Sequence, residues 1–138
     1  MPPIVVDANV IFAAIHSGAS QTRQRLLTME RRLYTPTYFA VELYKHRQRI
    51  AKNAKATESE QVEYLEKVLH RVRFFAEELI ETVHFFEAFR LCKDVDLDDL
   101  SYVALTLQLN ADLWTRDEHL KTGLRAKGFT RFFDEIPA

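Results

Sequence analysis

Two short apolar runs, each followed by an aspartate, constrain the fold of this chain more than any other feature. Residues 4–6 ("IVV") precede Asp7, and residues 113–115 ("LWT") precede Asp117. Apolar and β-branched residues in runs this short predict buried strands. Because helical patterns separate the runs, we expect an α/β fold in three layers, α/β/α, with a short central parallel sheet.

Periodicity and capping residues predict the remaining elements. Brief strands are expected over residues 32–36 and near Val83. Thr35 as N-cap and Pro36 at the first helical position predict the start of one helix, and Asn110 tolerates the left-handed conformation that ends another. Helical spacing predicts helices from about residue 10, over 21–30, 36–50, 58–72 and 86–92, and from 98 or 99 to 110.

Composition limits the class of protein. The 138 residues are 47% hydrophobic, enough for the core of a single domain over residues 1–138. A net charge of -1 gives no global attraction to polyanions, so nucleic acid would need a local basic patch. Cys92 is the only cysteine, which excludes an internal disulfide and suits a reducing compartment. No apolar stretch reaches the roughly 20 residues of a membrane span, so we expect a cytoplasmic protein.

Residues 94–105 ("DVDLDDLSYVAL") concentrate negative charge, which costs on the order of 1 kcal/mol for a close pair in water. Asp94, Asp96 and Asp98 match the first, third and fifth positions of an EF-hand loop, but Asp99 stands where that loop requires Gly and Leu105 where it requires Glu. The segment is therefore no calcium loop. The chain also lacks the P-loop, G-x-G-x-x-G and H-E-x-x-H motifs.

Four acids from separate segments are predicted to meet at one edge of the sheet. Ligands of open parallel sheets bind beyond the carboxyl ends of the strands, where Asp7 and Asp117 lie. Asp99 begins the helix before the second of these strands, and Glu42 lies on a helix that follows a strand end. Carboxylates this close need cations, and Mg²⁺ or Mn²⁺ suits oxygen ligands.

Simpler interpretations exist for single acids. Asp98 and Asp99 could complement a helix N-terminus, worth roughly 0.3–1 kcal/mol. Glu42 could be a surface residue of its helix, and Asp117 could be a helix cap. Asp7, directly after a buried strand, would be costly unless it is paired or metal-bound. The metal-site hypothesis depends on the set of acids.

A basic segment, residues 44–55 ("YKHRQRIAKNAK"), follows Glu42 and contains no acid. Such a strip could hold RNA through phosphate contacts, with Tyr44 and His46 stacking on bases. The alternative is a solvated helix face opposite the acids at 58, 60 and 63. The candidate RNA-binding residues are Lys45, Arg47, Arg49 and Lys52, followed by Lys55.

The segments "VVDANV", "AVEL" and "DDLSYVALTLQLNADLWTRDEHL" together resemble the PIN-domain family over nearly the whole chain. The resemblance implies a PIN-like α/β/α fold and a metal-dependent ribonuclease, often the toxin of a toxin–antitoxin pair such as the VapC-like toxins. It assigns the family's four acid roles, catalytic and metal-binding, to Asp7, Glu42, Asp99 and Asp117.

The same resemblance extends to supporting residues and partners. It makes Asn9 and Thr115 polar residues that line or brace the pocket, and Asp96 an accessory metal-binding acid. It implies RNA as substrate, an antitoxin protein as a possible partner and a possible homodimer. The run 105–107 ("LTL") departs from the usual "LAL" without evident chemical consequence.

Two rival functions remain. A catalytically inactive PIN-like module could bind RNA or protein without cutting, although such a module could lose an acid and all four are present here. A phospho-receiver domain is also a parallel α/β fold, but it needs an acid pair after the first strand, where "VVDANV" has one acid.

Overall fold

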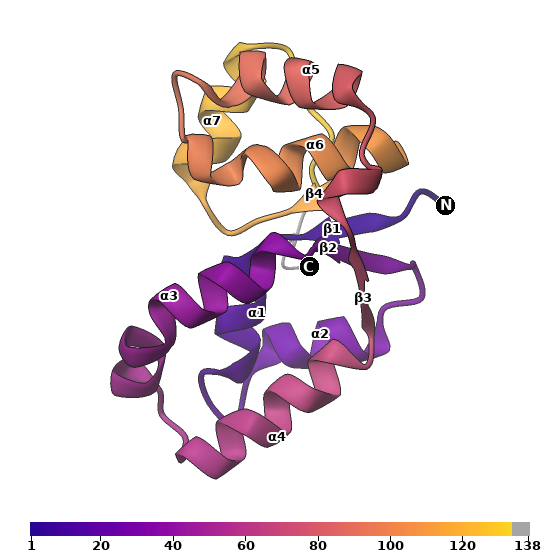
Figure 1. Ribbon diagram of the computed structural model, residues 1–138. Helices are drawn as coiled ribbons and strands as arrows, with labels where there is room; N and C mark the ends of the chain where they lie inside the picture. Colours follow the sequence, from indigo (N-terminus) through magenta and orange to yellow (C-terminus); the bar gives the residue numbers. More distant parts are fainter. Residues whose placement is uncertain (134–138) are drawn as a thin grey trace.

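A four-stranded parallel sheet forms the centre of the computed structural model, which describes residues 1–133 (Figure 1). The strand order is β3-β2-β1-β4. The strands are β1 (Ile4–Val6), β2 (Leu33–Pro36), β3 (Val72–Phe75) and β4 (Asp112–Trp114). All three strand pairs are parallel, so the predicted short parallel sheet is confirmed. Residues 134–138 of the predicted domain lie outside the described range.

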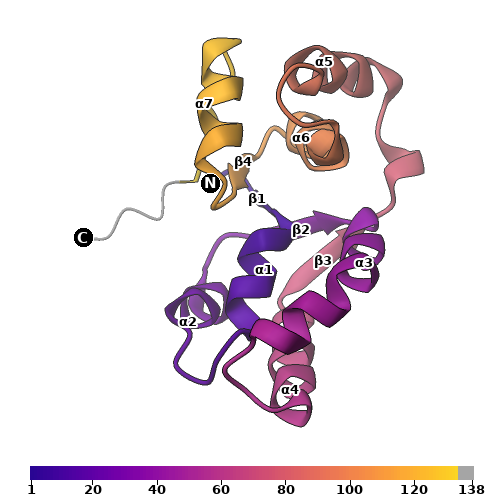
Figure 2. The same ribbon diagram turned by 90° about the vertical axis from the view of Figure 1, so that its left-hand side faces the viewer.

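Helices cover both faces of the sheet, which confirms the three-layer α/β/α architecture (Figures 1 and 2). One face carries α1 (Ala8–Ile15), α2 (Gln21–Thr28), α3 (Tyr38–Asn53) and α4 (Glu58–Leu69). The other carries α5 (Thr82–Cys92), α6 (Leu100–Leu109) and α7 (Glu118–Ala126). Short 3-10 turns occupy Glu77–Leu79 and Leu97–Asp99.

The core lies on both sides of β1. All three residues of β1 are fully buried, as expected for a central parallel strand with both faces covered. The largest fully buried side chains are Trp114, Tyr102 and Phe39, from β4, α6 and α3. The sheet edge that holds Asp7 is therefore supported by rigid elements on both faces.

The predicted start of α3 was wrong, because Thr35 and Pro36 belong to β2. Thr37 is the N-cap residue, and the cap itself comes from a distant acid. The Glu77 carboxylate accepts hydrogen bonds from the Thr37 hydroxyl and, at 2.7 Å, from the Tyr38 amide. A carboxylate at a helix N-terminus satisfies free amides and complements the helix dipole.

Three further predictions need correction. The helix expected over 58–72 ends at Leu69 and gives way to β3 at Val72. The strand expected near Val83 is absent, because this residue lies inside α5. The first helix begins at Ala8 rather than near residue 10. The left-handed end of α6 is confirmed, with φ of 51° at Asn110.

Candidate metal-binding active site

Asp7 lies at the carboxyl end of β1 with only 4% of its surface exposed. Its amide donates to the Trp114 carbonyl of β4 at 2.9 Å, so the backbone continues the sheet up to the acid. Burial raises the pKa of the Asp7 carboxyl to about 7, against a hydrogen bond from Thr115 that lowers it, and the negative charge of Glu42 adds to the rise. Asp7 is thus a buried acid close to a second acid.

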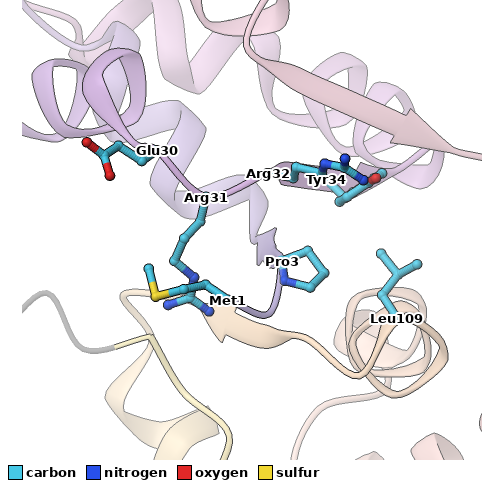
Figure 3. A pocket seen from close by; sticks show the side chains of 7 residues that line it. All are labelled: Met1, Pro3, Glu30, Arg31, Arg32, Tyr34 and Leu109. Carbon is cyan, nitrogen blue, oxygen red and sulfur yellow. The ribbon is translucent and has the colours of Figure 1, made fainter.

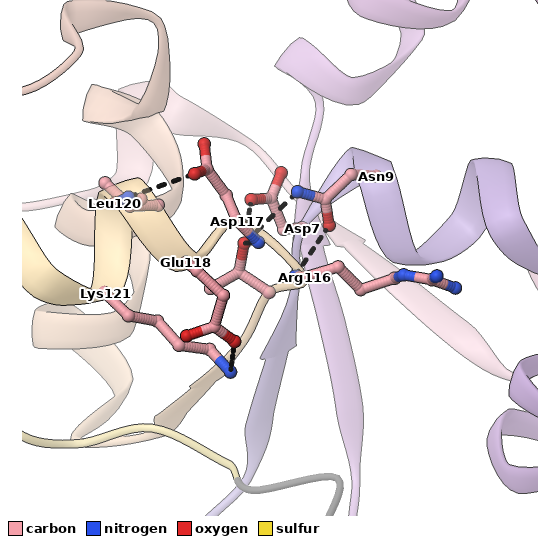
Figure 4. A network of polar contacts seen from close by, with 8 residues as sticks. Asp7, Asn9, Arg116, Asp117, Glu118, Leu120 and Lys121 are labelled. Atoms are coloured by element: carbon pink, nitrogen blue, oxygen red, sulfur yellow. Dashed lines mark hydrogen bonds and ion pairs between the residues drawn. The ribbon is translucent and has the colours of Figure 1, made fainter.

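The hydroxyl of Thr115 orients Asp7, whose side chain Figure 4 shows beside those of Asn9 and Asp117. It accepts hydrogen bonds from the Asn9 side-chain amide at 3.2 Å and from the Asp117 backbone amide at 3.1 Å. Its one proton goes to Asp7 Oδ2 at 2.8 Å. Asn9 also accepts from the Arg116 amide at 3.1 Å. The two predicted bracing residues, Asn9 and Thr115, therefore fasten the end of β4 to the start of α1.

Asp117 is the N-cap residue of α7, a helix that only the simpler interpretation of Asp117 as a cap had implied. Its Oδ1 accepts the Leu120 amide at 3.0 Å, so the simple interpretation of Asp117 as a helix cap describes a real contact. Asp117 is half-buried and its charge acts on Asp99. Capping uses one carboxylate oxygen and leaves the other for a ligand.

Burial and four neighbouring acids raise the pKa of the Asp99 carboxyl. Its pKa is raised to about 8, first by burial and then by four negative charges. It occupies the N-cap position of α6, where its charge can complement the helix N-terminus, but its side chain makes no capping hydrogen bond. The four acids that act on it are Asp7, Asp96, Asp117 and Glu42.

The loop before Asp99 is held against α7. A Cβ on Gly123 would lie 2.6 Å from a methyl group of Val95, so only glycine allows this approach. Lys127 pairs with Asp94 at 3.1 Å. Asp96 is exposed, and its Oδ1 accepts the Asp98 amide at 2.9 Å. The predicted accessory acid thus lies at the rim of the site.

Glu42 approaches the site from α3. Burial raises its pKa, while a hydrogen-bonding influence of the Tyr102 hydroxyl lowers it. Its Oε1 is buried and makes no hydrogen bond within ordinary limits of geometry in residues 1–133. Tyr102 was not among the predicted site residues, although a phenol one helical turn after Asp99 in a mostly apolar helix was a readable signal.

The four predicted acids therefore interact electrostatically, and the charges of His46 and Lys45 partly offset that of Glu42. None of Asp7, Glu42, Asp99 or Asp117 forms an ion pair within 4.0 Å in the part of the chain described. Within residues 1–133, no three acid, histidine or cysteine side chains already stand in metal-ligating geometry. The donor set nonetheless fits a hard divalent ion, because buried carboxylate oxygens that repel one another gain most from such a cation.

Three of the predicted RNA-binding residues follow Glu42 along one side of α3. Lys45, Arg49 and Lys52 succeed it at helical spacing, and all three are exposed. We call these three residues the cationic track. In residues 1–133 it forms no ion pair with the acids at 58, 60 and 63, and both the RNA-binding strip and the solvated helix face stay predictions.

Arg47 lies off this track. Its guanidinium stacks 3.8 Å from the Tyr44 ring centroid and donates to the Tyr44 carbonyl. It lines an apolar groove of about 340 Å³ between α3 and α4, with Leu43 and Leu65 among its neighbours. Arg47 and the track therefore face different parts of the surface.

The opposite edge of the sheet holds a different pocket, of about 470 Å³ (Figure 3). Residues before β1 and β2 and at the end of α6 line it, among them Pro3, Arg31 and Leu109. There Arg31 pairs with Asp112 at 2.5 Å and donates to the Pro2 carbonyl at 2.7 Å. This edge carries no predicted site residue.

No helix within residues 1–133 has the length and apolar character to cross a membrane. Among proteins with curated descriptions, none matches this chain. The structure of PAE2754 from Pyrobaculum aerophilum matches with a TM-score of 0.63 at 16% identity, over 88% of this chain and 79% of that one. VapBC2 from Rickettsia felis, solved bound to a DNA fragment from their promoter, matches with a TM-score of 0.60 at 19% identity, over 86% of this chain and 91% of that one.

At these identities the two structures show a shared fold. The model of the PIN domain family matches residues 5–133 of the chain, from β1 through the end of the described range. That match includes every acid of the site. The chain belongs to the PIN domain family.

Proposed function

We propose that this protein is a Mg²⁺- or Mn²⁺-dependent ribonuclease, an endonuclease that hydrolyses RNA phosphodiester bonds, formed by one domain over residues 1–138. The observation that carries the proposal is the convergence of Asp7, Glu42, Asp99 and Asp117 without an ion-paired cation in residues 1–133. A purely structural cluster would be stabilised by a lysine or arginine, since unpaired buried charges are costly.

Each acid has a distinct part in the reaction. A bound divalent ion would activate water and neutralise charge on the scissile phosphate. Asp7 and Asp99, the most deeply desolvated of the four, would hold the ion, with Asp117 and Asp96 completing the oxygen set from the rim. Glu42 would orient the attacking water through its carboxylate.

The RNA would reach the acids along the cationic track. Lys45, Arg49 and Lys52 lead away from Glu42 on a single side of α3, so a strand bound there would pass the site. Contacts of this kind fix position without reading sequence. Arg47 would contribute from the neighbouring surface, with Tyr44 as a stacking platform.

We further propose that the protein is the cytoplasmic toxin of a type II toxin–antitoxin pair. The likeness to VapBC2 supports this assignment. The exposed apolar side chains of α5, Val83, Phe86 and Phe89, offer a surface for an antitoxin or for a second copy of the chain. Phe86 is 72% exposed, and neighbouring exposed apolar side chains often mark an interaction surface.

The test is cleavage of a mixed RNA pool by the purified protein, with Mn²⁺ or with EDTA, followed by mapping of the cut ends. We expect cleavage inside chains with Mn²⁺ and none with EDTA. Equal cleavage in both would contradict metal dependence. Binding of the pool without cleavage under any divalent ion would favour the inactive module.

A further inference from the structure

Two buried side-chain oxygens in residues 1–133 lack a hydrogen bond: Oε1 of Glu42 and the hydroxyl of Tyr102. One can only accept when ionised, and the other can donate. A buried polar group left unpaired is destabilising, so two complementary unpaired groups in one region call for an explanation.

The packing places the two groups in the same region. Tyr102 is fully buried on α6, and its ring meets the Tyr38 ring edge-on, with centroids 6.5 Å apart. Tyr38 and Glu42 lie one turn apart on α3, so they share a side of that helix. Asp99 precedes Tyr102 by one turn on α6. The phenol therefore lies between the helices that supply Glu42 and Asp99.

The electrostatics of the site agree with this placement. Burial, a hydrogen-bonding influence of Glu42 and the charges of Glu42, Asp7 and Asp99 all raise the pKa of the Tyr102 hydroxyl. The same hydroxyl lowers the pKa of Glu42. Tyr102 therefore stays protonated, as a hydrogen-bond donor facing the acids must.

We propose that Tyr102 is a positioning residue of the site, whose hydroxyl donates a hydrogen bond to Oε1 of Glu42 and leaves Oε2 for the reacting water or the metal. Its effect on catalysis rests on the proposed function, whereas the hydrogen bond does not. A fixed carboxylate orientation matters because small misplacements of a catalytic group cost large factors in rate.

The hydrogen bond is tested without metal or RNA, by thermal unfolding in EDTA. Tyr102→Phe should lower the unfolding midpoint of the otherwise unchanged protein by about 3–6 °C. In a Glu42→Gln background the acceptor oxygen remains, so the loss should persist. In a Glu42→Met background no acceptor remains, so Tyr102→Phe should leave the midpoint unchanged or raise it. An equal shift in all three backgrounds would overturn the proposal.

Positioning is tested by Mn²⁺ calorimetry and by kinetics. Tyr102→Phe should weaken Mn²⁺ binding or lower kcat by about 10-fold, the low end of losses for residues that orient ligands, with KM for RNA unchanged. Tyr34→Phe is the matched control, because this half-buried phenol lines the pocket at the opposite edge of the sheet. Matching losses in the control would overturn the positioning role. Absence of RNA cleavage by the unchanged protein would instead contradict the proposed function and leave the unfolding cycle decisive.

Discussion

The two ends of the parallel sheet treat aspartate in opposite ways. At the amino edge, Asp112 forms ion pairs with Arg31 at 2.5 Å and with Arg131 at 3.5 Å (Figure 3 shows Arg31). At the carboxyl edge, Asp7 and Asp99 are desolvated beside other acids, and no cation of residues 1–133 pairs with them. The Asp112 charge is balanced by the protein itself.

This difference distinguishes acids that stabilise the fold from acids that are available to bind a metal ion. An aspartate with its own arginines adds to stability and has no need of an ion from solution. An aspartate whose pKa is raised by burial and by like charges weakens the folded state until a cation binds. The same substitution at the two edges should therefore have opposite consequences.

The largest difference between the two edges is expected from a matched pair of Asp→Asn substitutions. Asp99→Asn should reduce Mn²⁺-dependent RNA cleavage by more than about 100-fold, beyond the losses typical of residues that only orient ligands. Its unfolding midpoint in EDTA should stay the same or rise, because a repelling charge is removed. Cleavage assays and thermal scans measure the two effects.

Asp112→Asn is the control at the other edge. It should retain cleavage and lose roughly 1–3 kcal/mol of stability, because two arginines lose a partly exposed partner. Loss of cleavage without loss of stability in this variant would contradict the division between the edges.

A smaller effect is expected from pH, in EDTA. The folded-state pKa values of Asp7 and Asp99, about 7 and about 8, lie above the ordinary 3.8 of an aspartate. Between about pH 4 and pH 8 the folded state thus holds protons that the unfolded state has lost. Stability should fall as pH rises through this window, by at most about 1.4 kcal/mol per pH unit for each group.

Thermal scans at pH 5, 6.5 and 8 measure this slope. The double variant Asp7→Asn, Asp99→Asn should lose most of it, because neither side chain titrates. A slope that persists in the double variant would assign the pH dependence to other groups.

The smallest effect is expected on RNA affinity, from the removal of two positive charges of the cationic track. Lys45→Ala with Arg49→Ala should weaken RNA binding several-fold and reduce the slope of log affinity against log salt by about 1–2, since each phosphate contact in a single strand contributes about 0.7. Filter binding in the Asp7→Asn background keeps the RNA intact. Arg32→Ala is the control, because Arg32 lines the amino-edge pocket. An equal loss of RNA affinity in this variant would contradict binding along the cationic track.

Strands β1, β2 and β4, and the acids that follow β1 and β4, were predictable from the sequence for a local reason. β-branched and apolar runs bury themselves, and an acid directly after such a run must lie at a strand end, which holds for Asp7. Family resemblance added Glu42, Asp99 and Asp117. The left-handed Asn110 was also predictable, because its short polar side chain tolerates that conformation.

Elements that depend on distant partners could not be predicted in this way. The start of α3 depends on Glu77, a residue of another segment that caps it. Edge strand β3 buries only Val72 well, so its pattern resembled the end of a helix. Val83 and Phe86 of α5 are exposed, which obscured the amphipathic pattern of a helix.

The amino-acid sequence alone established which acids are present and that Asp7 and Asp117 follow strands, because both properties are local. Packing between distant segments established that Thr115 bridges Asp7 and Asp117, that α3 and α6 bring Glu42 and Tyr102 into one region, and that within residues 1–133 Asp112 alone among these acids pairs with arginines. The reason is physical: the charge state and ligand preference of a carboxylate depend on burial and on neighbours that lie far away along the chain.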